Sequence, residues 1–101
     1  MEVREWFDTL PTRADPAKTA SMINTYFFDV EGASKWRVDV KEGTVTVAEN
    51  GADDTDVTLT AAEDVFKAIV NGEQNATSAY MTGKLKIRGD MGAAMKLQNL
   101  F

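Results

Sequence analysis

Hydrophobic positions at the start of the chain recur with the spacing of an amphipathic helix. Residues 1–10 place four apolar side chains at the i, i+3, i+4 and i+7 positions, and these are Val3, Trp6, Phe7 and Leu10. We expect Pro11 to end this helix, because proline does not continue the helical hydrogen-bond ladder. Asp15 as N-cap and Pro16 at the first helical position then predict a second short helix that fades near Met22.

From residue 23 onward the hydrophobic period changes to two, which is typical of strands that bury one face. Five segments alternate apolar with polar or charged residues, and they cover residues 23–31, 35–41, 44–47, 57–60 and 84–88. The alternation is strictest around Trp36, Val38 and Val40, since every residue between and beside them is charged. Glu42 and Gly43 separate the second segment from the third and predict a hairpin turn.

Three further helices are predicted in the second half of the chain. Thr60 and Glu63 match a capping box, and the helix that they open carries an apolar stripe and ends near Gly72. Residues 73–82 are predicted as another helix. The last helix starts at Asp90, and four side chains are expected to stack along one side of it: Met91, Ala94, Met95 and Gln98.

These elements predict an α+β fold of two layers. Each strand is apolar on one face and polar on the other, which is typical of a mostly antiparallel five-stranded sheet with one solvated face. About five short amphipathic helices are expected to cover the apolar face. The chain of 101 residues has the length of one ordinary domain, and we expect a single domain over 1–101.

Composition excludes most catalytic chemistry. The chain has no histidine and no cysteine, which excludes histidine bases, thiol nucleophiles and the commonest metal ligands. We therefore expect no enzyme activity, no metal and no cofactor. The net charge of −5 argues against nucleic-acid binding, and no apolar run is long enough to span a membrane. A cytoplasmic location is expected, and contact with membranes would be transient.

Three features leave more than one interpretation open. The acidic stretch between Glu42 and Phe66 fits a solvated loop better than a calcium loop, since its order departs from that template. The glycines around residues 84–88, next to three cations, fit turns and caps, or a site for a lipid headgroup or coenzyme phosphate. Met81, Met91 and Met95 fit plain core packing, or an adaptable cavity beside the small residues of the last helix.

Several segments together resemble the sterol carrier protein 2 domain, the non-specific lipid-transfer family. The resemblance is dense over residues 55–98 and covers essentially the whole chain. Its segments are DVTLT at 56–60, AIVNGE at 68–73 and, most specifically, MTGKLKIRGDMGAAMKLQ at 81–98. It implies a five-stranded sheet covered by helices with an apolar tunnel between the layers.

The resemblance also implies a function, which is non-catalytic binding and transfer of lipids inside the cell. We expect a linear acyl chain as the ligand, carried by a fatty acid, a fatty acyl-coenzyme A or a phospholipid. The residues expected to line the tunnel are Phe28, Trp36, Phe66, Ile69, Tyr80, Met81, Met91, Met95 and Gln98. The alternative is an interaction module that binds no lipid, has a solid core and supports a partner enzyme.

Overall fold

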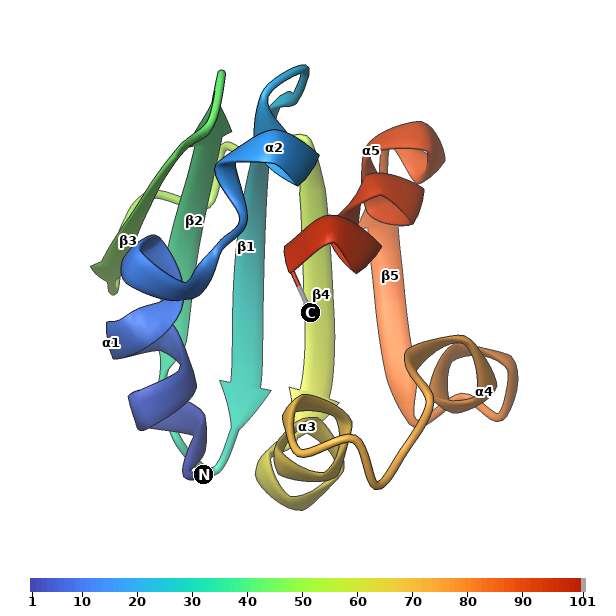
Figure 1. The fold of residues 1–101 in the computed structure, drawn as a ribbon. Coiled ribbons are helices and arrows are strands. Elements are labelled where there is room, and N and C mark those ends of the chain that lie inside the picture. The colour runs from blue at the N-terminus through green and yellow to red at the C-terminus, as the bar shows by residue number, and fades with distance from the viewer. Residues whose placement is uncertain (101) are drawn as a thin grey trace.

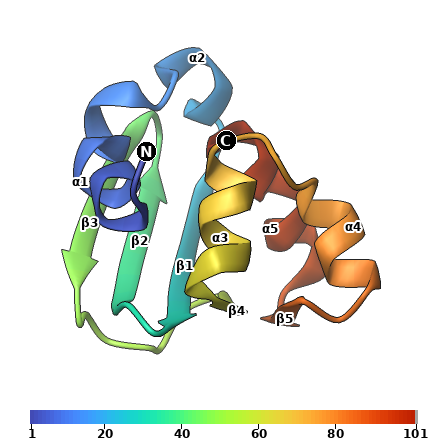
Figure 2. The same ribbon diagram turned by 90° about the horizontal axis from the view of Figure 1, so that it is seen from below.

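The structure, a computed structural model, describes residues 1–100, without the side chain of Gln98. Its helices are α1 (Val3–Arg13), α2 (Pro16–Thr19), α3 (Glu63–Val70), α4 (Ala76–Met81) and α5 (Met91–Lys96), followed by the 3-10 turn η1 (Leu97–Leu100). Its strands are β1 (Ile23–Glu31), β2 (Lys35–Lys41), β3 (Thr44–Glu49), β4 (Val57–Ala62) and β5 (Leu85–Gly89). The helices cover one face of the sheet and leave the other face open, which confirms the two-layer α+β prediction (Figures 1 and 2).

The five strands form one sheet in the order β3-β2-β1-β4-β5. Three of the four strand pairs are antiparallel, and the central pair of β1 with β4 is parallel. The sheet is therefore mostly antiparallel, as expected, but the alternation pattern did not indicate the direction of β4. The connection from β3 to β4 crosses the β1–β2–β3 part of the sheet. It places β4 next to β1, on the side opposite β2, and β4 runs in the same direction as β1.

Arg37 holds this connection against the open face of the sheet. Its Nη1 donates to the carbonyl oxygen of Ala52 at 3.0 Å and to Oδ1 of Asp54 at 2.5 Å, while its Nε donates to Oδ1 of Asp39 at 2.8 Å. The predicted acidic loop is thus tied to the sheet through one arginine. Phe27, which interrupts the alternation of β1, is only 8% exposed on this open face.

Several helix boundaries differ from the sequence prediction: α2 ends at Thr19, α4 starts at Ala76, and α5 ends at Lys96, so Gln98 lies in η1 and not on the last α-helix. Two further differences have a clear structural cause. α1 continues through Pro11 to Arg13, because a proline ring costs one hydrogen bond whereas the four buried side chains of α1 hold the whole helix against the sheet. The predicted capping box at Thr60 is also wrong, because the backbone of Thr60 belongs to β4 and pairs with both β1 and β5. α3 instead starts at Glu63, with Ala62 as its N-cap.

The core lies between the helices and the apolar face of the sheet. Side chains that were predicted to point inward are buried there, with Trp36 and Val40 1% exposed and Leu85 4% exposed. No helix among residues 1–100 is long and apolar enough to cross a membrane. The inner layer is filled very differently at its two ends, and this difference creates the candidate site.

Candidate functional site

Aromatic rings fill the inner layer under α1. Phe7 of α1 stacks on Trp36 of β2, with ring centroids 4.3 Å apart, and lies parallel to Phe66 of α3 at 5.5 Å. Trp6 and Phe28 meet this group edge to face. Interlocked rings of this kind leave little free space, so this end of the molecule is a solid core.

A pocket of about 250 Å³ occupies the other end of the inner layer, under α3, α4 and α5. It is bounded below by β4 and β5 and above by the three helices and the start of η1. Its lining residues are Leu59, Phe66, Ile69, Ala76, Thr77, Tyr80, Leu85, Ile87, Met91, Ala94, Met95 and Leu97. Phe66 belongs to both regions and forms the boundary between the solid core and the pocket.

The pocket exists because α4 and α5 carry small residues toward the sheet. Ala76 of α4 and Ala94 of α5 line the pocket, and their methyl groups leave the space beneath the helices unfilled. Ala79 and Ala93, 0% and 2% exposed, pack closely in the core beside it. The larger residues of these helices lie at the rim instead. Met91 and Met95 line the pocket and yet are 47% and 68% exposed, which places them around its mouth.

A buried tyrosine fixes α5 over the pocket. The Tyr26 hydroxyl donates to the carbonyl oxygen of Ala93 at 2.7 Å, and the Tyr26 side chain is fully buried. Burial raises the pKa of Tyr26 well above its usual range, and the negative charges of Asp56 and Asp90 add to this. The hydroxyl therefore stays protonated and remains a hydrogen-bond donor at any physiological pH.

The start of α5 is fixed by a second set of contacts. Asp90 is the N-cap, and its Oδ1 accepts from the N–H groups of Gly92 at 2.9 Å and Ala93 at 3.3 Å. The backbone N–H of Asp90 donates to the carbonyl oxygen of Asp56 at 2.9 Å. Since the Asp90 carboxylate already occupies these amides and carries negative charge, this helix start is a cap rather than a phosphate site.

The chemistry of the pocket lining favours an apolar ligand. None of the described residues that line it is charged, and the polar side chains among them are Thr77 and Tyr80. A fully buried carboxylate or phosphate would therefore lose its hydration without a compensating charge. Residues 1–100 also contain no group of three or more acidic side chains placed to hold a metal ion.

A wider hollow of about 700 Å³ lies over β1, β2 and β3. Its lining mixes Ile23 with polar and charged residues such as Thr25, Asp39, Lys41 and Asp56. Although it is larger, its lining includes four charged residues, Asp39, Lys41, Glu42 and Asp56, whose hydration an apolar molecule would displace without compensation. The smaller apolar pocket is therefore the candidate site.

The structure brings five of the nine predicted lining residues together at this pocket: Phe66, Ile69, Tyr80, Met91 and Met95. Phe28 and Trp36 lie in the aromatic core instead, each 1% exposed, because the rings of α1 cover them. Met81 lies outside the lining and is 79% exposed. The Gln98 side chain lies outside the described part of the molecule.

Seven lining residues were not predicted from the sequence: Leu59, Ala76, Thr77, Leu85, Ile87, Ala94 and Leu97. The alternation pattern already placed Leu59, Leu85 and Ile87 on the apolar face of the sheet. What it lacked was the strand order, which puts β4 and β5 side by side and away from α1. Thr77 and Leu97 gave no signal, because neither stands out from the polar and apolar pattern of its helix.

Comparison with known proteins agrees with this architecture. Sterol carrier protein 2 of Homo sapiens is 51% identical over 65 residues, which make up 64% of this chain and 12% of the human protein. The chain thus corresponds to a small part of that relative. The solution structure of the sterol carrier protein domain 2 of Helicoverpa armigera has a TM-score of 0.80 and 31% identity, covering 97% of this chain and 84% of that one.

A second solved structure shares the fold at lower identity. It is the NMR structure of palmitated SCP2L2 from Aedes aegypti, with a TM-score of 0.76, 24% identity, and coverage of 96% of this chain and 91% of that one. A family model described as the SCP-2 sterol transfer family matches residues 6–101. The chain therefore belongs to the SCP-2 sterol transfer family, whose domains bind and transfer lipids and are generally non-catalytic.

Proposed function

We propose that this protein carries one fatty acyl chain, as a fatty acid or a fatty acyl-coenzyme A, in the pocket under α3, α4 and α5. The observation that carries the proposal is the mainly apolar lining of the pocket, in which none of the described residues is charged. The SCP2L2 protein of Aedes aegypti, which shares this fold, was solved in a palmitated form, and this supports an acyl chain as the ligand class. The protein acts in this proposal as a cytoplasmic carrier without catalysis.

The size of the pocket suggests how the ligand lies. A volume of 250 Å³ holds roughly eight chain carbons, if each occupies about 30 Å³ as a water molecule does. The rest of a long chain would lie against Met91 and Met95 at the mouth, where flexible thioether side chains adapt to it. The headgroup would then remain in solvent, close to the Tyr80 hydroxyl.

This arrangement predicts moderate affinity and weak headgroup selectivity. Each buried methylene contributes about 0.8 kcal/mol, and the lost freedom of the ligand offsets much of the sum. We therefore expect a dissociation constant in the micromolar range. A free fatty acid and its methyl ester should bind with similar affinity, because the described lining residues include no lysine or arginine that could pair with the carboxylate.

The test is a titration with a fluorescent fatty-acid analogue. Met95→Lys should weaken saturable binding severalfold, because the lysine ammonium group must stay in water and its side chain therefore gives up part of the apolar contact that Met95 makes at the mouth. Met95→Leu should retain binding and cost under about 1.5 kcal/mol of stability. Met81→Lys is the matched control, since Met81 lies outside the lining, and it should bind like the unchanged protein. Each variant is first checked for cooperative unfolding.

Two results would contradict the proposal and favour the non-binding interaction module. One is the lack of a saturable signal up to about 100 micromolar analogue. The other is normal binding by a folded Met95→Lys variant. Native mass spectrometry of freshly purified protein gives an independent readout. A lipid carrier should co-purify with a bound lipid, which would add a discrete mass to that of the protein.

A further inference from the structure

Methionine carries all the sulfur of this chain. The chain has five methionines and no cysteine, so the sulfur chemistry open to an oxidant is oxidation of thioethers. Met22 is buried, with 1% of its surface exposed. The other four are open to solvent: Met1 is 48% exposed, Met81 79%, Met91 47% and Met95 68%. A small oxidant dissolved in water can therefore reach four of the five thioethers.

Two of the exposed methionines lie at the mouth of the candidate pocket. Met91 and Met95 both belong to α5 and both line the pocket. They are four residues apart, so their side chains lie on the same side of consecutive helical turns. In the proposed function, the part of the acyl chain that exceeds the pocket volume lies against these two side chains. The same sulfurs are thus open to water in the empty protein and covered when a ligand is bound.

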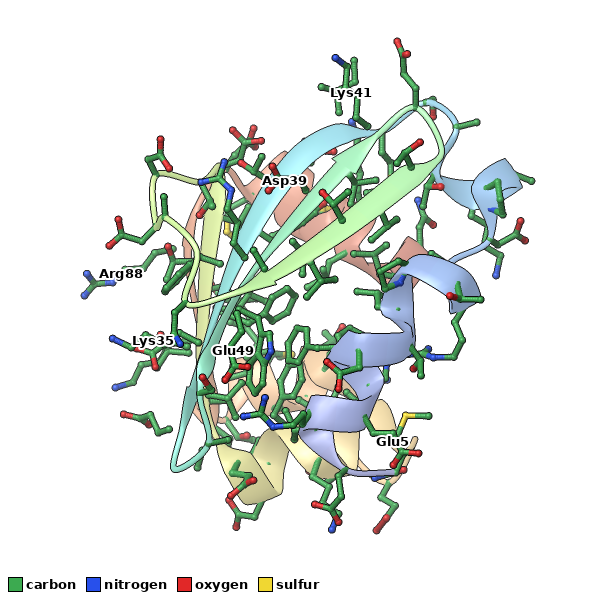
Figure 3. All side chains as sticks on the ribbon, turned by 90° about the vertical axis from the view of Figure 1, so that its left-hand side faces the viewer. Glu5, Lys35, Asp39, Lys41, Glu49 and Arg88 are labelled. Carbon is green, nitrogen blue, oxygen red and sulfur yellow. The ribbon has the colours of Figure 1, made fainter. Side chains whose placement is uncertain are left out.

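The remaining exposed methionines lie elsewhere and provide reference positions. Met81 ends α4 and is not a lining residue. Met1 precedes α1, on the side of the molecule that carries Glu5 and Glu49 (Figure 3), and α1 lies away from α5 in both ribbon views (Figures 1 and 2). Met1 and Met91 are almost equally exposed, so they differ in position and not in access to solvent.

We propose that Met91 and Met95 form a reversible modification site, where hydroperoxides oxidise both thioethers to sulfoxides and thereby lower the affinity of the pocket for acyl chains. In each reaction the sulfur attacks the terminal oxygen of the peroxide, and an S–O bond forms as the O–O bond breaks. The proton of the transferred oxygen passes to the leaving oxygen, which departs as water or an alcohol. The sulfur loses two electrons and the peroxide gains them.

The change in affinity follows from the polarity of the product. Oxidation turns a flexible apolar side chain into a polar one, whose oxygen accepts hydrogen bonds from water. An acyl chain at the mouth offers no hydrogen-bond donor, so a sulfoxide that stays in contact with it loses this hydration without compensation. Because both contacts of α5 with the ligand change together, we expect the affinity to fall roughly tenfold. This effect rests on the proposed function, whereas the reactivity of the exposed sulfurs does not.

The first experiment compares the five methionines within one molecule. The protein is treated with dilute hydrogen peroxide, with and without a saturating acyl methyl ester, and sulfoxide at each position is followed by peptide mass spectrometry. Without the ester, Met22 should react at least tenfold more slowly than the four exposed methionines, because its sulfur is buried. With the ester, Met91 and Met95 should react severalfold more slowly, while the rates at Met1 and Met81 stay the same.

The second experiment measures affinity with the fluorescent fatty-acid analogue before and after peroxide treatment. The unchanged protein should lose affinity roughly tenfold. Treatment with the two methionine sulfoxide reductases that act on the two sulfoxide epimers should restore it. A variant with Met91→Leu and Met95→Leu should keep the affinity that it had before treatment, because leucine has no sulfur. Met81→Leu is the matched control and should lose affinity as the unchanged protein does. Cooperative unfolding is checked for each sample.

Three results would overturn the inference. The first is an unchanged affinity of the protein that carries both sulfoxides at Met91 and Met95. The second is an equal loss of affinity from the double leucine variant, because the relevant reaction would then lie elsewhere. The third is equal protection of Met81 and Met95 by the ester, because the ligand would then not cover the mouth specifically. The proposed function fails in a different way, since its failure appears as a lack of binding before any peroxide is added.

Discussion

Gly89 holds the junction between β5 and α5 in a conformation that other residues rarely adopt. Its φ is +109°, and a Cβ atom at this position would collide with the backbone carbonyl oxygen of Asp56. That carbonyl is the acceptor of the Asp90 N–H, so it is held in place and does not move away easily. Gly89 lies within residues 81–98, the segment that most closely resembles the family, and both its positive φ and the close Asp56 carbonyl require a residue without a side chain there.

We predict that Gly89→Ala destabilises the protein by more than about 2 kcal/mol, from the strained φ together with the backbone collision. Urea denaturation measures this as a lower midpoint at an unchanged slope. Gly72→Ala is the control, because Gly72 also has a positive φ, of +76°, but has open space around its missing Cβ. Its cost should be about 1 kcal/mol. Equal costs for the two variants would mean that the collision is absent.

The carboxylate of Glu49, at the end of β3, accepts hydrogen bonds from two other side chains. It accepts from both terminal nitrogens of Arg4, at 2.6 and 3.0 Å, and from the Ser34 hydroxyl at 2.8 Å. The same guanidinium lies over the ring of Trp36, with 5.5 Å between its carbon and the ring centroid. These hydrogen bonds, from Arg4 first and Ser34 second, lower the pKa of Glu49 from 4.5 to about 2.

A lowered pKa in the folded state makes the contribution of Glu49 dependent on pH. The carboxylate stabilises the fold fully above pH 4.5, and the contribution is lost as the pH falls toward 2. We predict that the urea midpoint of the unchanged protein falls more steeply than that of Glu49→Gln over this range. The difference should be small and reduced by salt, because the pair is exposed. Parallel pH profiles would contradict the prediction.

One buried hydrogen bond attaches α5 to the sheet. This helix has only six residues, Met91–Lys96, and its packed side chains are small, so its own packing supplies little stability. The bond from the Tyr26 hydroxyl to the Ala93 carbonyl links the helix to the centre of β1. Tyr26 therefore acts on the pocket indirectly, by fixing the helix that carries Met91 and Met95.

We predict that Tyr26→Phe lowers the free energy of unfolding by about 1–2 kcal/mol, because the buried carbonyl of Ala93 loses its donor. It should also weaken binding of the acyl analogue severalfold, since α5 is held less firmly over the pocket. Hydrogen exchange of the α5 amides, compared with those of β1, shows whether the loosening is local. Unchanged exchange in α5 would mean that packing alone positions this helix.

Strand and helix identities were largely predictable from the sequence, whereas their ends and neighbours were not. The period-two pattern identified all five strands, because the buried and half-buried apolar residues of each strand fall mainly on one face. Local patterns did not reveal that Thr60 pairs with strands on both sides, since pairing depends on residues far away in the chain. For the same reason, Phe28 and Trp36 could not be assigned to the aromatic core rather than to the pocket.

The molecule as a whole divides into a solid end and a hollow end, and mutations should affect them differently. We predict that Phe7→Ala costs about 3–5 kcal/mol, because Phe7 is fully buried and stacked between two other rings. Met91→Ala, at the half-exposed rim, should cost under about 1 kcal/mol and shift the preferred acyl chain length instead. Thermal unfolding and a series of acyl analogues measure the two effects. A large stability loss from Met91→Ala would show that the rim is part of the core.

The position of β5 at the end of the sheet has a consequence for solubility during folding and storage. A sheet edge can accept a strand from another copy of the chain, which is a common start of aggregation. Lys84, Lys86 and Arg88 place three like charges along this edge, so two such edges repel one another. These cations thereby keep concentrated protein from pairing strand to strand.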